Sequence, residues 1–89
     1  MLLAKVVGTV VATQKRAEMV GLKIQIIQPL DPRTGTTVGN LEVVIDAVGA
    51  GRGEKVLVTQ GSSARIAINK DNCPIDAAIV GIVDQLDVE

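Results

Sequence analysis

The sequence contains no phenylalanine, tyrosine, tryptophan or histidine, and it has one cysteine. Because single-stranded nucleic acids usually stack on aromatic rings, this composition argues against that class of binding protein. The lack of histidine removes the commonest general base and the commonest metal ligand. Any catalysis would fall to carboxylates, lysine, serine or Cys73. We therefore expect no enzyme activity, no metal site and no cofactor.

The chain also lacks a strong charge and a long apolar run. Its net charge of −1 gives no general attraction to nucleic acids or anionic membranes. A single cysteine excludes an internal disulfide, and we expect neither a signal segment nor a membrane-spanning run, because no basic stretch precedes an apolar one and the apolar runs are short. We expect a soluble, intracellular protein with no nucleic-acid or membrane partner.

What the chain does have is apolar side chains, which make up 47% of its 89 residues. The length suits one domain, and a domain of this size buries only about 60% of the surface of its unfolded chain. Some apolar surface therefore remains for other subunits to cover. Self-association is the first expectation.

The pattern of β-branched and apolar residues predicts five short strands. Gly8 predicts a bend or a close backbone approach in the first strand, and the second ends at Pro29. The segment "GSSARIAI" predicts one short helix that begins at the serine pair. Together these features favour an all-β fold, a small closed barrel without exposed strand edges. The expected strands are 2–13, 22–30, 41–48, 54–60 and 78–88.

Three glycines alternate in "VGAGRGE", at Gly49, Gly51 and Gly53. A dinucleotide-binding loop needs G-x-G-x-x-G before a helix, whereas here the spacing is G-x-G-x-G before a strand. A phosphate-binding Gly-Lys-Ser/Thr sequence is also absent. We interpret the stretch as a turn between two antiparallel strands, in which the glycines supply positive φ angles or close packing.

The segment "GSSAR" has two interpretations. Backbone N–H groups after Gly61 and the guanidinium of Arg65 would suit an anion. The alternative, which we favour, is an N-capped turn whose Arg65 makes an ion pair, across a subunit boundary for example. Ser62 and Ser63 lack the histidine base that a serine nucleophile usually needs.

Asp46, Asp76 and Asp84 are carboxylates set among apolar residues. A close pair of carboxylates can carry acid–base chemistry, but such residues more often cap turns or meet basic side chains. Cys73 precedes a proline in a polar turn and has no neighbour that would activate its thiol. These residues predict structural roles.

Four segments, taken in order, resemble one known family: "AKVVGTVVAT", "GLKIQIIQPLD", "VIDAVGAGRGEKVLVTQGSSAR" and "PIDAAIVGIVD". The chain resembles the EutN/CcmL family, the pentamer-forming vertex proteins of bacterial microcompartment shells. The resemblance covers nearly the whole chain. "D-x-V-G-A-G" followed by "G-S-S-A-R" is its most specific part.

The resemblance implies a single domain over residues 1–89, a five-stranded OB-like barrel with a short helix near 62–68. It also implies a non-catalytic homopentamer that joins hexameric shell proteins in the bacterial cytoplasm. The "GSSAR" segment would lie near the subunit interface and the five-fold axis, with Asp46 and Asp76 as possible partners of Arg65. The interface or pore candidates are Gly61, Ser62, Ser63, Ala64, Arg65, Asp46 and Asp76.

Two features differ from many relatives. Lys55 stands where many of them have tryptophan, and the sequence ends soon after "GIVDQLDV". The short end and the serine pair favour a catabolic metabolosome over a carboxysome. An OB-fold binding module or an adaptor without a shell role remains the alternative.

Overall fold

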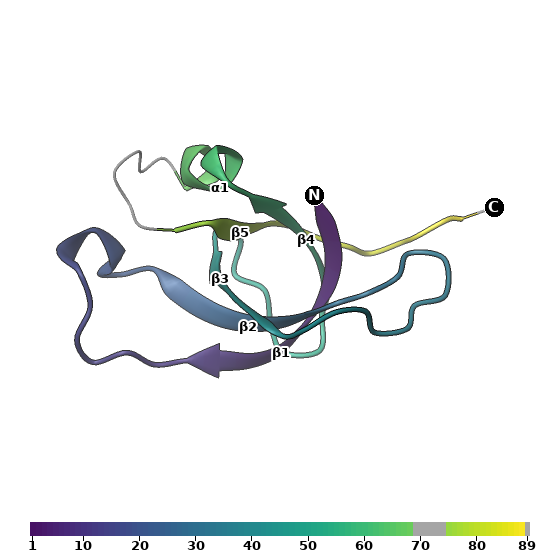
Figure 1. Cartoon of the computed structure of the whole chain (residues 1–89), viewed down its shortest axis with the longest axis horizontal. Coiled ribbons are helices and arrows are strands. Elements are labelled where there is room, and N and C mark those ends of the chain that lie inside the picture. Colours follow the sequence, from purple (N-terminus) through teal and green to yellow (C-terminus); the bar gives the residue numbers. More distant parts are fainter. Residues whose placement is uncertain (69–74, 89) are drawn as a thin grey trace.

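Five strands close into a small barrel, which confirms the predicted fold class. The structure, a computed structural model, describes residues 1–68 and 75–88. The strands are β1 Leu2–Val10, β2 Lys23–Pro29, β3 Glu42–Asp46, β4 Lys55–Gln60 and β5 Ala77–Ile82. They follow one another around the barrel in the order β1-β2-β3-β5-β4, and β4 pairs with β1 to complete the ring. Figure 1 shows this ring with the short helix α1, Ser62–Ala67, on its outside.

Neighbouring strands are antiparallel except at one seam, between β3 and β5. These two strands are parallel and are paired only at Ile45 with Ala78 and at Asp46 with Ile79. Parallel neighbours need a long crossover between them, and here β4 and α1 supply it. The seam is therefore the shortest junction of the barrel.

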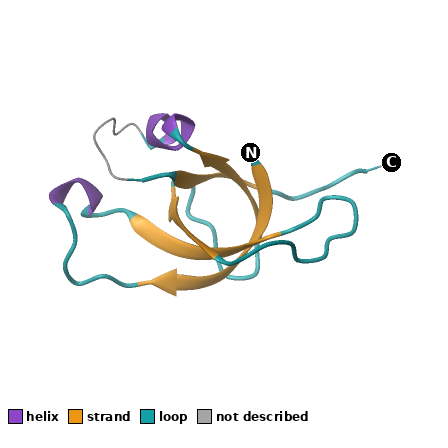
Figure 2. Ribbon diagram, viewed as in Figure 1, coloured by secondary structure: helices purple, strands orange, loops and turns teal. Residues whose placement is uncertain are grey.

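Three segments differ from the sequence prediction. The first strand ends at Val10, and the last ends at Ile82 rather than near residue 88, because each stops where its neighbour stops. The expected loop at 14–21 contains a short 3-10 helix, η1, over Ala17–Met19. Figure 2 shows η1 and α1 as the helices of the described chain. Cys73 lies outside the described residues.

The barrel has two separate apolar clusters, one inside and one outside. Successive side chains of a strand point to opposite faces, so Val44 of β3 packs inside while Ile45 packs outside. The outer cluster lies beneath α1, whose Ala64 is fully buried. The inner cluster contains Ala4, Val6, Ile27, Val44, Ala50, Val56, Val58, Ala77 and Ile79, and the outer one Ile24, Ile45, Ala64, Ile75 and Ala78.

Gly8 marks a bulge in β1, which confirms the predicted bend. The register with β2 shifts between Val6 and Gly8, so that the side chains beyond the bulge change faces. A Cβ atom at Gly8 would lie 3.3 Å from Cδ1 of Ile26. The missing side chain therefore lets Ile26 lie flat against β1.

The glycine-rich stretch is a turn, but it does not join neighbouring strands. It carries the chain from β3 across the end of the barrel to β4, and β5 lies between these two strands. Gly49 and Gly53 have φ angles of 79° and 88°, a region that side chains disfavour. Gly51 has no positive φ and donates its N–H to the carboxylate of Glu54. The two strands run in opposite directions, as predicted, but they are not paired with each other, because β5 lies between them.

The carboxylate of Asp46 holds this turn in place. Its Oδ1 accepts hydrogen bonds from the N–H groups of Val48 and Gly49, at 2.8 and 2.9 Å. Its Oδ2 accepts the N–H of Ala50 at 2.7 Å. Asp46 is buried, so the carboxylate replaces the water that would otherwise solvate these donors.

Gln25 joins the same network from inside the barrel and is 1% exposed. Its Nε2 donates to the carbonyl of Ala50 at 2.8 Å and to Oδ2 of Asp46 at 3.3 Å. Its Oε1 accepts from the hydroxyl of Thr9 at 2.8 Å, and Lys23 also donates to the Ala50 carbonyl. In the described part of the chain, every buried side-chain nitrogen and oxygen has a hydrogen-bond partner.

Substitution of Ile27 by alanine tests the inner cluster. Ile27 is fully buried, so Ile27→Ala should lower the free energy of unfolding by about 2–5 kcal/mol through lost burial and the cavity that remains. Chemical denaturation at one fixed protein concentration measures the change. Val48→Ala, at a residue 41% exposed, is the control and should change stability by less than about 0.5 kcal/mol.

Substitution of Asp46 by asparagine tests the turn. The amide nitrogen of asparagine would face backbone N–H donors in place of one carboxylate oxygen, so we expect a loss of about 1–3 kcal/mol of unfolding free energy. The same denaturation experiment measures it, with the exposed Asp84→Asn as control. Equal stability of the two variants would mean that the Asp46 carboxylate does not organise the turn.

Candidate functional site

The "GSSAR" segment forms the start of α1, as the resemblance implies. The N-cap residue is Gly61, with φ 66° and ψ −143°, and no side chain caps the helix. The serine pair was expected to provide the cap, but the chain leaving β4 enters the helix through a positive φ angle, which glycine permits. Ser62 and Ser63 are consequently exposed on the first turn.

Arg65 connects α1 to the segment that leads into β5. Its Nη1 donates to the carbonyl oxygen of Ile75 at 3.1 Å, and the N–H of Gly61 donates to the carbonyl of Asp76 at 2.7 Å. Two hydrogen bonds thus bind residues 75 and 76 to the helix. Arg65 has no ion pair with Asp46 or Asp76 in the part of the chain that the structure describes.

The seven predicted interface residues therefore fall into two groups. Residues 61–65 and Asp76 come together where α1 meets the start of β5. Asp46 instead points into the barrel end, where the turn occupies both of its oxygens. Ala64 is buried beneath α1, whereas the side chain of Asp76 is exposed.

The described residues offer no matched set for catalysis or metal binding. Ser62 and Ser63 have no hydrogen-bonded base beside them, and residues 1–68 and 75–88 contain no group of three metal-ligating side chains. No helix in these ranges is long and apolar enough to cross a membrane. The distinctive feature of the described residues is instead an exposed apolar surface.

That surface is an apolar sheet face on the outside of β1, β2 and β3, which we call the outer apolar face. Residues opposite one another in the register contribute it: Val10 faces Ile24, Ile24 faces Ile45, and Ile26 faces Val43. Val43 is 63% exposed. The outer apolar face consists of Val10, Ile24, Ile26, Val43 and Ile45. Ile24 and Ile45 belong to the buried outer cluster, Val10 and Ile26 are half-buried, and Val43 is the exposed member.

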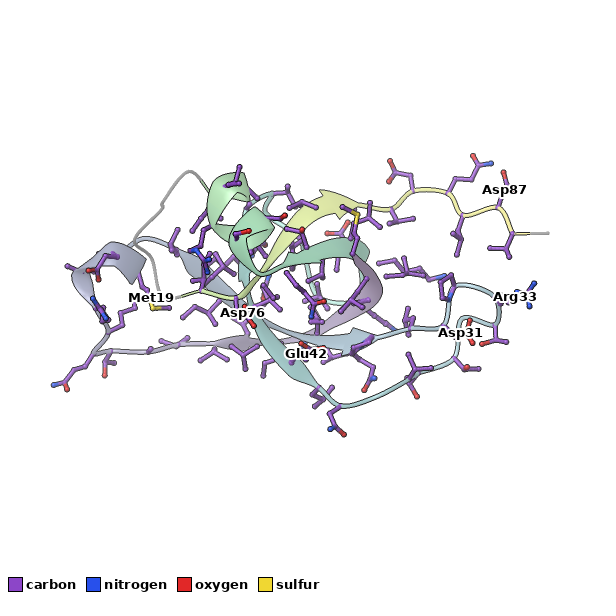
Figure 3. All side chains as sticks on the ribbon, turned by 45° about the horizontal axis from the view of Figure 1, so that its top comes forward. Met19, Asp31, Arg33, Glu42, Asp76 and Asp87 are labelled. Carbon is purple, nitrogen blue, oxygen red and sulfur yellow. The ribbon has the colours of Figure 1, made fainter. Side chains whose placement is uncertain are left out.

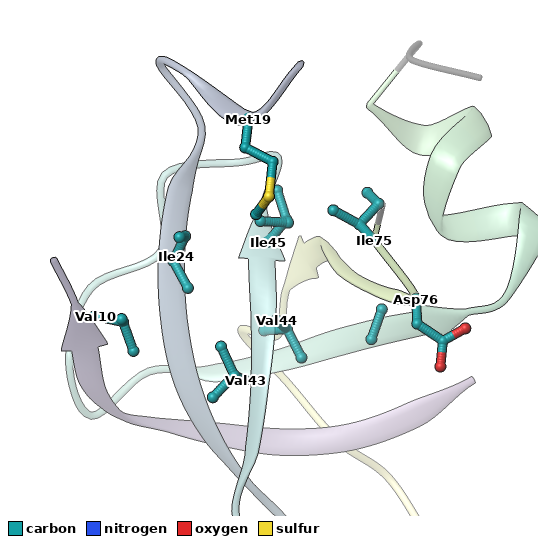
Figure 4. A pocket seen from close by; sticks show the side chains of 9 residues that line it. Val10, Met19, Ile24, Val43, Val44, Ile45, Ile75 and Asp76 are labelled. Carbon is teal, nitrogen blue, oxygen red and sulfur yellow. The ribbon is translucent and has the colours of Figure 1, made fainter. Parts of the chain in front are cut away.

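A groove of about 320 Å³ opens at one side of this face, along the β3–β5 seam. Val43 and Val44 line one wall of the groove, and Ile75 and Asp76 line the other (Figure 4). The groove opens because the chain segments that precede the paired residues of β3 and β5 diverge from each other. Met19 of η1 lies over its upper end in the same view. Asp76 is its one charged lining residue. The groove is therefore apolar, with a carboxylate at its rim.

The opposite end of the molecule carries a polar hollow. The connection between β2 and β3 turns at residues 31–36, where Oδ1 of Asp31 accepts a hydrogen bond from the N–H of Arg33 at 2.8 Å. Figure 3 shows both residues at the tip of this connection. The hollow has a volume of about 400 Å³. It is lined by Pro32, Arg33, Thr34, Gly35, Lys55, Leu86 and Val88.

The outer apolar face was not predicted from the sequence. A signal for it exists in "EVVID", where Val43, Val44 and Ile45 are consecutive. An uninterrupted apolar run in a strand indicates burial on both faces. The run alone does not say which element covers the second face.

Comparison of this chain with known proteins identifies a family and several relatives. A family model described as "Ethanolamine utilisation protein EutN/carboxysome" matches residues 1–84. A curated relative from Rhodospirillum rubrum, named bacterial microcompartment shell vertex protein GrpN, is 47% identical over 87 residues, 98% of this chain and 97% of its own. The carboxysome shell vertex protein CcmL of a Synechocystis species is 46% identical over 88 residues, 99% of this chain and 87% of its own.

A solved structure of a relative has the same fold. It is described as the GrpN pentameric microcompartment shell protein from Rhodospirillum rubrum, and it superimposes with a TM-score of 0.90 at 44% identity, over 100% of both chains. The match thus covers the barrel, α1 and the connections between them. Sequence and fold together show that this chain belongs to the EutN/CcmL family.

Proposed function

We propose that this protein is a structural subunit that assembles into five-membered rings and closes the vertices of a bacterial microcompartment shell. Two kinds of relative support the proposal: GrpN and CcmL are both named shell vertex proteins, and the solved GrpN structure is described as pentameric. The subunit would work in the bacterial cytoplasm, where its neighbours in the shell would be hexameric facet proteins.

The observation that carries the proposal is the outer apolar face. An antiparallel sheet that faces water on one side normally alternates apolar and polar residues, with the polar ones outward. Here Val43 points outward and is 63% exposed, and the outward-pointing Val10 and Ile26 are only half-buried by the described residues. Contiguous apolar surface of this kind marks a protein interface. A ring of identical subunits would bury it.

A vertex subunit needs a fixed shape more than a reactive group. Five-fold rings close only if every interface has the same angle, because each subunit meets its neighbour head to tail. A closed barrel whose turn is fixed by the buried Asp46 and Gln25 gives such a rigid wedge. The role requires no catalysis and no cofactor. We place the exposed Ser62 and Ser63 at the interface or beside the five-fold axis.

For the type of compartment, we propose a catabolic metabolosome. The two kinds of relative are nearly equally similar, at 47% and 46% identity, so overall similarity does not separate them. The serine pair at the start of α1 supports the metabolosome assignment. Facet proteins of the two compartment types provide the direct test.

Native mass spectrometry of the purified protein near neutral pH should give one dominant species of five subunits. Five copies of a 9.3 kDa chain have a mass of about 46.5 kDa. Dilution over two decades of concentration, followed by the same measurement, checks that the species is a specific assembly. A monomer or dimer throughout this range would contradict the proposal and would favour an adaptor that covers its apolar face with another partner.

Co-expression with hexameric facet proteins should convert open sheets or tubes into closed particles, because a flat hexagonal layer closes only when five-fold units are added. Electron microscopy of preparations with and without the chain measures this change. A parallel experiment uses facet proteins from a carboxysome and from a catabolic compartment. Closure with the carboxysome set alone would overturn the metabolosome assignment and retain the vertex role.

A further inference from the structure

We propose that the outer apolar face of one subunit packs against a second, basic face on the next subunit, formed on the outside of β1 and β4. This inference rests on the ring proposed above and specifies which surfaces meet in it. The basic face consists of Leu3, Lys5, Lys55, Leu57 and Gly81. Leu57 of one copy would enter the groove beside Val43 of its neighbour.

Strand alternation defines the basic face. In β4, Val56 and Val58 are fully buried inside the barrel, so Lys55 and Leu57 point outward. In the register with β1 and β5, Leu57 lies opposite Leu3 on one side and Gly81 on the other. Leu57 is 37% exposed beside a residue without a side chain. Its Cδ1 lies 3.6 Å from the position that a Cβ atom of Gly81 would take, so Leu57 covers Gly81 and presents an apolar surface there.

The two faces lie on different sides of the barrel and share only β1, to which the outer apolar face contributes Val10 and the basic face Leu3 and Lys5. In the order β1-β2-β3-β5-β4, β4 is separated from β2 and β3 by β1 on one side and by β5 on the other. A head-to-tail ring needs two different surfaces on each subunit, one for each neighbour. A two-fold dimer would instead use one surface twice. The arrangement of apolar groups on both flanks fits the ring.

The exposed area of the subunit also fits a ring with two different junctions. A stable interface buries roughly 800 Å² on each partner, so a ring subunit would bury about 1,600 Å² in its two junctions. The isolated subunit exposes 5588 Å². Between a quarter and a third of this surface would be covered. One apolar face cannot supply both junctions, and the leucines of β1 and β4 supply the second.

Charge complementarity identifies the partner of the basic face. Lys5 and Lys55 are directly opposite in the β1–β4 register, and both are exposed. Like charges in this position repel one another. Neither ammonium group forms an ion pair with a carboxylate of the described ranges. The exposed Asp76 at the groove rim supplies the missing negative charge from the next subunit.

Two single substitutions test the pairing of the faces. Val43→Glu places a charge on the outer apolar face, and Leu57→Glu places one on the basic face. Both residues are exposed in the subunit, so each variant should fold but fail to form the ring, which thermal unfolding by circular dichroism and native mass spectrometry check. Val48→Glu, at a comparably exposed residue on neither face, is the matched control and should remain pentameric.

Mixing the two variants gives the decisive result. Each variant retains one intact face, and the intact faces are different, so an equimolar mixture should form one junction and stop at a dimer of about 18.6 kDa. A mixture that remains monomeric would show that these faces do not meet. Pentameric single variants would also overturn the pairing while leaving the vertex function intact. A wild-type protein that is not pentameric would instead contradict the proposed function.

Exchange of charges tests the role of Asp76 separately. Lys55→Glu and Asp76→Lys should each weaken association roughly two- to fivefold per junction, as loss of an exposed ion pair does. The double variant should recover most of this loss, because the pair is restored with its signs reversed. Dissociation on dilution at low and high salt measures the effect. Additive weakening in the double variant would exclude a direct pairing of the two positions.

Discussion

The buried carboxamide of Gln25 links β1, β2 and the connection after β3, and the path of the chain across the end of the barrel depends on this link. Its oxygen accepts from Thr9, while its nitrogen donates to Asp46 and to the carbonyl of Ala50. Because β3 does not turn back on itself, residues 48–50 have no strand partner for their N–H groups. The Asp46 carboxylate replaces that partner. The crossing it stabilises leaves the position between β3 and β4 free for β5.

A second consequence concerns the outside of the barrel. Since β5 pairs with β3 over only two residues, the seam diverges into a groove lined by Val43, Ile75 and Asp76. α1 covers the outer cluster but leaves Val43 exposed, because Gly61 and Arg65 fix the helix beside the start of β5. The subunit therefore buries its inner face by folding. In the proposed ring a neighbour would cover the exposed part of the outer apolar face, which would couple the stability of the subunit to its assembly.

Much of the fold was predictable from local signals. The strand that ends at Pro29 and the bend at Gly8 follow from residue chemistry that acts within a few positions. The ends of the first and last strands could not be predicted from local signals, since a strand ends where its hydrogen-bonded neighbour ends. The N-cap was assigned to the serine pair, but the direction of the chain after β4 requires the positive φ of Gly61. Cys73 stays a prediction outside the described residues.

The sequence by itself determined the number of strands, the short helix, the turn at the three glycines and the family. It also indicated surplus apolar surface, because composition alone exceeds what a domain of this size buries. Only the tertiary structure decided where that surface lies. Whether Val43 or Leu57 faces water depends on strand order and register, which are set by contacts between residues distant in the chain. Periodicity gives the alternation of faces, and the closed barrel alone decides which face remains uncovered.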